Sequence, residues 1–197
     1  MELLATDAIR FMHVLSVCIG LGASFLADII VLSRLKQKID DDLLIVLHKI
    51  HGIVWLTLLV MWISGISMIY VRTGFDLANF TPKLIAKVVT VSLLTLNALV
   101  IGSLAFPYIR SVKGQSIKSL PVGTKLLMAF IGGVSSASWI LALAMGISKT
   151  LAQSNAGVFL GLLPLAYFGA MACAFFVLIW NKTKDAGPRN PRVAVAP

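Results

Sequence analysis

Apolar residues in this chain fall into five long runs, and most of the charged residues lie between them. A helix that spans the hydrocarbon core of a bilayer needs roughly 20 mainly apolar residues, so each run predicts one spanning helix. The first run is longer than the apolar part of a secretory signal, and the residues before it are not net positive, which favours a retained helix. The sequence therefore predicts an all-α fold, a polytopic membrane helical bundle of about five transmembrane helices. The five runs are about Ile9–Leu32, Leu44–Val71, Leu84–Phe106, Leu126–Ile147 and Val158–Trp180.

Polar residues within these runs follow helical stripes. In the first run His13, Val17, Gly20, Ser24 and Asp28 share one face at 100° per residue. A helix that contacts lipid turns such a polar, small-residue stripe toward its neighbours. We therefore expect His13 and Asp28 to face the interior, about 22 Å apart along the helix axis.

The second and third runs carry similar faces. In the second run His51, Trp55, Trp62 and Gly65 share a face, with His48 at its edge; in the third run Lys83, Lys87, Thr90 and Asn97 do so. Ionisable groups at membrane depth are costly and indicate function by default.

Composition supports a membrane location. Of the 197 residues 58% are hydrophobic and 13% are charged, and the mean hydropathy is +0.94, whereas soluble domains are about 25% charged. The net charge of +9 does not indicate nucleic-acid binding, because the basic residues are spread among the connections between runs. Membrane topology and anionic lipid headgroups explain that pattern.

The basic residues also predict orientation. Twelve of them lie on one side of the predicted bundle and five on the other. The rule that cytoplasmic loops are richer in Lys and Arg places the first set in the cytoplasm and the N-terminus outside. We predict a bacterial-type inner membrane protein, with residues 1–180 forming the bundle and 181–197 a disordered cytoplasmic tail. The twelve are Arg34, Lys36, Lys38, Lys49, Arg110, Lys113, Lys118, Lys125, Lys182, Lys184, Arg189 and Arg192; the five are Arg10, Arg72, Lys83, Lys87 and Lys149.

Depth in the membrane divides the ionisable residues into two candidate sites. His13 and Lys87 lie at the outer level, and Asp28 lies at the inner level with His48 or His51. Plainer interpretations remain for each: Lys87 can extend to the headgroups, the two histidines can be interfacial residues at a helix start, and Asp28 can pair with Lys49 or Arg34. Glycines such as Gly20, Gly22 and Gly65 permit either tight helix packing or the approach of a flat macrocycle.

The order of three segments resembles a known family. The segments are RFMHVLSVCIGLGASFL, HKIHGIVWLTLLVMWISGISMIY and PKLIAKVVTVSLLTLNAL, and they resemble the HemJ-type membrane protoporphyrinogen oxidases and the looser set of CopD-like membrane proteins. The resemblance implies a four-helix core that holds haem b, with His13 and Lys87 matching the family His and Lys. The chain departs from that pattern at Ala27-Asp28, where the oxidases have Pro-Arg, at Asn97, near which they tend to have a His, and in its fifth helix.

We therefore expect an integral membrane haem b protein that acts in electron transfer or oxidation, with a quinone-like or porphyrin-like reductant. In this hypothesis His13 is an axial ligand of the haem iron, and Lys87 is a second ligand or a partner of a haem propionate. Asp28, His48 and His51 form a proton or substrate site on the cytoplasmic side.

Two other classes of function remain open. One is a small transporter or channel in which the same ionisable residues line a pathway. The other is a non-catalytic subunit of a larger membrane complex, or a homo-oligomer, because small residues such as Gly132, Gly133 and Ser136 suit helix–helix packing.

Overall fold

The computed structural model describes the backbone of residues 2–183 and the side chains of residues 3–176. Within that part of the chain every regular element is helical, and five helical segments are long and apolar enough to cross a membrane. The predicted all-α multi-pass bundle is confirmed. The elements are α1 (Glu2–Ser33), α2 (Asp41–Thr73), α3 (Pro82–Val100), the π-helical turn η2 (Ile101–Ala105), α4 (Phe106–Ser111), α5 (Val122–Ile147) and α6 (Ala156–Thr183), with short 3-10 turns η1 (Leu77–Asn79), η3 (Ile117–Ser119) and η4 (Thr150–Ala152).

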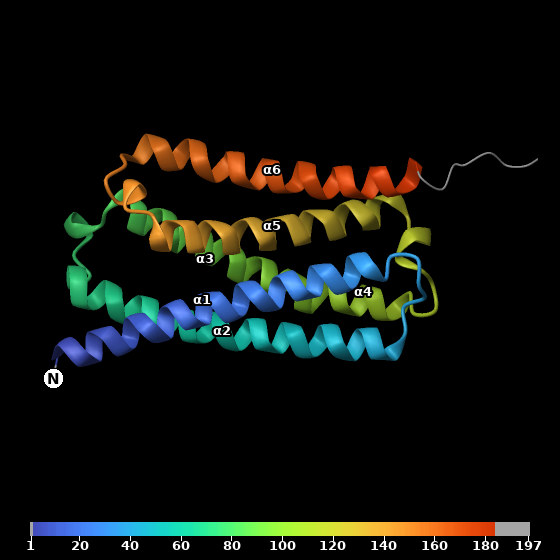
Figure 1. Ribbon diagram of the computed structural model, residues 1–197, viewed down its shortest axis with the longest axis horizontal. Coiled ribbons are helices and arrows are strands. Elements are labelled where there is room, and N and C mark those ends of the chain that lie inside the picture. The colour runs from blue at the N-terminus through green and yellow to red at the C-terminus, as the bar shows by residue number, and fades with distance from the viewer. Residues whose placement is uncertain (1, 184–197) are drawn as a thin grey trace, which may run out of the picture.

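The helices run side by side along the long axis of the molecule (Figure 1). The segments α3, η2 and α4 form one continuous span, Pro82–Ser111. Helix α1 packs mainly on α2 and also on α5, and α5 in turn packs on α3 and α6. Helix α6 lies along one edge of the bundle, with α2 along the opposite edge.

The small-residue stripe of α1 forms its buried face, as predicted. Val17, Gly20 and Ser24 are buried, while His13 and Asp28 are half-buried. The other side of α1 exposes large apolar side chains such as Phe25 and Ile29. A helix with this division presents its apolar side to lipid and its polar stripe to its neighbours.

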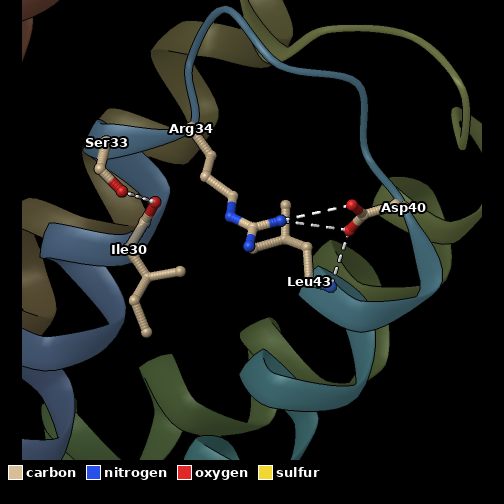
Figure 2. Close-up of polar contacts among 5 residues, drawn as sticks. All are labelled: Ile30, Ser33, Arg34, Asp40 and Leu43. Carbon is tan, nitrogen blue, oxygen red and sulfur yellow. Dashed lines mark hydrogen bonds and ion pairs between the residues drawn. The ribbon is translucent and has the colours of Figure 1, made fainter.

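The turn between α1 and α2 is fixed by a capped helix start (Figure 2). The carboxylate of Asp40 accepts a hydrogen bond of 2.8 Å from the backbone N–H of Leu43, and the guanidinium of Arg34 lies 3.3 Å from the same carboxylate. The hydroxyl of Ser33 donates to the carbonyl of Ile30 and closes the last turn of α1. Arg34 thus pairs with Asp40 and not with Asp28.

Two connections, residues 34–40 and 112–121, join at one end of the bundle, which we call the basic end. Ile39 donates its N–H to the carbonyl of Gln115 at 2.8 Å and accepts from Gly114 at 2.9 Å. Gly114 has a φ of 85°, a left-handed conformation that suits glycine.

Desolvation, followed by the charges of Lys36 and Lys125, holds the pKa of Lys118 below its ordinary value.

The predicted tail begins inside the last helix. Helix α6 continues to Thr183, so residues 181–183 are helical. The remainder of the predicted tail lies outside the described residues.

Candidate functional site

The carboxylate of Asp28 contacts α5. The hydroxyl of Ser136 donates to Asp28 Oδ2 at 2.8 Å across a sequence separation of 108 residues. A Cβ added at Gly132 would lie 3.7 Å from Asp28 Oδ1, so the absence of a side chain there leaves room for the carboxylate. Asp28 is therefore held at the interface of α1 and α5, and not by the interfacial cations that the simpler interpretation offered.

His51 is held in one tautomer by Trp55. The indole N–H of Trp55 donates to His51 Nε2 at 2.9 Å. Because an indole nitrogen only donates, Nε2 must accept, and the neutral ring carries its proton on Nδ1. A Cβ at Gly102 would lie 3.1 Å from the same Nε2, so His51 lies close to the backbone of the π-helical turn.

Asp28 and His51 line one cavity of about 170 Å³ between α1, α2, α3 with its continuation α4, and α5. The structure thus brings together two of the residues predicted for the inner site. Most of the remaining lining is apolar, and the polar groups in it are mutually paired: Ser24 bonds Ser135 at 2.9 Å, and Asn97 donates to the carbonyl of Ile131 at 3.0 Å. The wall also includes Ala27, Val31, Leu47, Ile50, Val54, Leu94, Ala98, Ile101, Ala105, Phe106, Ile109, Met128 and Gly132.

Apolar clusters bound this cavity toward both ends of the bundle. Toward the basic end lies a cluster that includes Leu35, Ile39 and Ile117, packed under the paired connections. Toward the opposite end lies a cluster that includes Met61 and Trp139. A molecule that reaches the cavity without crossing either cluster comes from the side, where the bundle faces lipid.

The sequence interpretation missed the π-helical turn and Phe106. Proline lacks the N–H that continues an α-helical ladder and its ring clashes with the preceding turn, so Pro107 disturbs the helix at this point; the N–H of Phe106 bonds the carbonyl of Ile101, five residues back. The Phe106 ring lies 5.2 Å from the His51 ring, centroid to centroid. Such turns occur often at functional sites, and Pro107 within an apolar run was the signal that marked it.

His48 does not join the cavity. Helix α2 begins at Asp41, so His48 and His51 lie two and nearly three turns inside it and not at its start. His48 is exposed, and its ring packs against the edge of Phe106 at 5.8 Å. Phe106 therefore contacts both histidines, and of the two only His51 lines the cavity.

His13, the predicted haem ligand, is also held in one tautomer. Its Nδ1 lies 3.0 Å from Ser64 Oγ, and the Ser64 hydroxyl donates to the carbonyl of Val60 at 2.6 Å. Since the single hydroxyl proton is engaged there, His13 Nδ1–H is the donor and Nε2 keeps a free lone pair. Histidine ligands of metals commonly have this arrangement, with the second nitrogen donating to a fixed acceptor.

Lys87 is half-buried on α3 and lies within electrostatic reach of His13. The pairing of His13 with Lys87 as ligands stays a prediction. The two side chains also share the same end of the bundle as Arg72 and Lys83, whose charges act on Lys87.

A small cavity lies at the end of the bundle that contains His13. It measures about 30 Å³, and its lining does not include His13. The indole ring of Trp139 occupies the space beside Gly20, where a Cβ would lie 2.6 Å from Trp139 Cζ2. Gly20 therefore serves tight helix packing, one of the two roles that the sequence left open for it.

No known protein family, curated protein or solved structure matches this chain. Within residues 3–176 no three side chains of His, Cys, Asp or Glu gather as a metal site.

Proposed function

We propose that this multi-pass membrane protein binds the polar head of a lipid-soluble redox carrier, such as a quinone, in the cavity between Asp28 and His51. The observation that carries this proposal is the presence of a carboxyl and an imidazole in the wall of one cavity inside the membrane-spanning bundle. Under this proposal the protein takes part in electron transfer or oxidation, as an oxidoreductase or as a component of one.

The chemistry of the lining suits a quinone. Because Trp55 occupies His51 Nε2, the Nδ1–H of His51 is the donor that a quinone carbonyl would accept from. Reduction of a quinone to a quinol consumes two electrons and two protons; Asp28 is a group able to supply and receive protons, and a separate redox partner would supply the electrons. Buried carboxyl and imidazole groups commonly serve such proton exchange in membranes.

The size and access of the cavity agree with a small head on an apolar tail. At about 170 Å³ it is similar in size to an engineered protein cavity of about 150 Å³ that binds benzene, so a single small ring fits. The apolar clusters above and below favour entry from lipid, and the tail of the carrier would remain in the bilayer.

Binding can be measured by the quenching of tryptophan fluorescence in detergent-purified protein by a short-chain quinone. Removing one hydrogen-bonding partner should weaken binding about 2- to 12-fold, the equivalent of roughly 0.5–1.5 kcal/mol. We expect this from both Asp28→Asn and His51→Gln. His48→Gln is the matched control, because His48 is on the same helix but outside the cavity. Saturable binding that is identical in all three variants would refute the site.

A second candidate is haem b binding at His13, favoured by the free lone pair on His13 Nε2 and by the resemblance of His13 and Lys87 to the HemJ-type pattern. The test is the absorption spectrum of protein purified from haem-replete cells. A b-type spectrum that is lost in His13→Ala would establish it, and a colourless native protein would rule it out.

For orientation we propose that the basic end faces the cytoplasm of a bacterial-type inner membrane, with the N-terminus outside. The excess of Lys and Arg in the connections at that end supports this. A green fluorescent protein fused to the C-terminus should fluoresce, whereas alkaline phosphatase at the same point should be inactive. The reverse result would invert the topology.

A further inference from the structure

Besides Lys149, the end of the bundle opposite the basic end collects four cations. Arg10 lies on α1, Arg72 on the last turn of α2, and Lys83 and Lys87 on the first turns of α3. Lys83 donates to the backbone carbonyl of Ser148 at 2.7 Å and so caps the end of α5. Lys87 lies within electrostatic reach of both Lys83 and Arg72.

Carboxylates compensate little of this charge. Asp7 lies 3.4 Å from Arg10 in an exposed pair, and Asp76 accepts the N–H of Ala78 at 2.9 Å. Among the described side chains, no ion pair involves Arg72, Lys83 or Lys87. Like charges held near a low-dielectric region repel one another unless an anion joins them.

A small pocket opens between two of these cations. It measures about 30 Å³, and Arg10 of α1 and Arg72 of α2 line it together with Thr6. Its remaining walls are Ile9, Met68 and Val71. The side chains of Arg10 and Arg72, on neighbouring helices, both contribute to this lining. Guanidinium groups bind the oxygens of a phosphate or carboxylate, and the mainly apolar lining suits a hydrocarbon chain.

We propose that this pocket binds the anionic headgroup of a membrane lipid, an oxyanion on an apolar body, between Arg10 and Arg72. Lys87, on the neighbouring helix α3, adds a further positive charge. The oxyanion is a phosphate diester if the ligand is a phospholipid and a carboxylate if it is a fatty acid. This site is independent of the cavity that contains Asp28 and His51.

The full-length chain in uncharged detergent micelles provides the test. A ligand that binds the native state raises the unfolding temperature, and the rise grows with the logarithm of ligand concentration over Kd. Phosphatidylglycerol, phosphatidylcholine with the same acyl chains, and oleate are therefore titrated separately. We expect phosphatidylglycerol or oleate to raise the unfolding temperature and phosphatidylcholine to leave it nearly unchanged. If phosphatidylglycerol raises the unfolding temperature the site binds a phosphate, and if oleate raises it the site binds a carboxylate.

Variants locate the effect. Arg72→Gln and Arg10→Gln should each weaken the apparent affinity about tenfold or more, since each removes a charge-assisted pair. The apparent affinity of Arg72→Lys should lie between that of these variants and that of the native protein. Lysine keeps the positive charge but lacks the planar guanidinium that bonds two oxygens at once. Arg110→Gln, an exposed cation near the basic end, is the control for general attraction to anions and should bind as the native protein does.

The proposal fails if phosphatidylcholine stabilises as much as the anions, or if Arg110→Gln weakens binding as much as Arg72→Gln. Quinone quenching in the arginine variants should equal that of the native protein, so a failure here is distinct from a failure of the cavity proposal.

Discussion

Gly20 of α1 lies directly against the indole ring of Trp139 of α5. A Cβ at this position would lie 2.6 Å from Trp139 Cζ2, closer still to Cη2, and 2.8 Å from Thr57 Oγ1. Ordinary contacts between carbon atoms are about 3.5–4.0 Å. Trp139 is fully buried, so the ring cannot move away without displacing its neighbours, and Gly20→Ala should separate α1 from α5.

The magnitude follows from two opposing effects. Overpacking of this kind costs about 1–3 kcal/mol, and alanine gains up to about 1 kcal/mol over glycine in helix propensity. Gly22→Ala is the matched control, because it lies on the same helix with no atom within 4 Å of its added Cβ. It receives the propensity gain alone, so the difference between the two variants isolates the clash.

Thermal unfolding of the two variants in detergent measures that difference. At roughly 2–4 °C per kcal/mol for a chain of this size, Gly20→Ala should unfold roughly 2–12 °C below Gly22→Ala for a clash of about 1–3 kcal/mol. Trp139→Phe, which shortens the ring, should restore part of the loss in the double variant. Equal unfolding temperatures for Gly20→Ala and Gly22→Ala would refute the close packing of α1 on α5.

Three further substitutions test other contacts by the same unfolding measurement. Asp40→Ala removes the cap of α2 and should cost about 1 kcal/mol, whereas Asp40→Ser should recover most of it; equal losses would contradict the capping role. Asn97→Leu removes the buried bond to the Ile131 carbonyl and should cost about 0.6–1.7 kcal/mol, the range of such bonds in membranes; a gain in stability would show that this bond does not support the packing of α3 on α5. Lys113→Ala breaks the exposed 2.6 Å pair with Asp41 and should cost less than about 1 kcal/mol, with the cost vanishing at high salt; a larger, salt-independent loss would indicate a different role.

Helical periodicity predicted which residues of the candidate sites face inward, but not which residues they contact. The 100° spacing predicted that Ser24 and Asp28 face inward, and they do. It did not reveal that the partner of Asp28 is Ser136, because the choice of neighbouring helix depends on how five spans are arranged. The bond from Trp55 to His51 joins positions four apart on one helix, so it could have been predicted from the sequence. The cavity could not be predicted in this way, because it depends on the turn at Ile101–Ala105 and on the arrangement of four helices.

The number of spans, their helical class and the buried stripe of α1 could be predicted from local pattern, because about 20 apolar residues cross a bilayer and a helix repeats every 3.6 residues. Which polar groups contact one another depends on how the helices pack. Asp28 contacts α5, and His51 lies in the wall of the cavity while His48 lies outside it. The indole ring of Trp139 packs directly on Gly20. Those outcomes depend on side-chain packing between segments far apart in the chain, which no local pattern specifies.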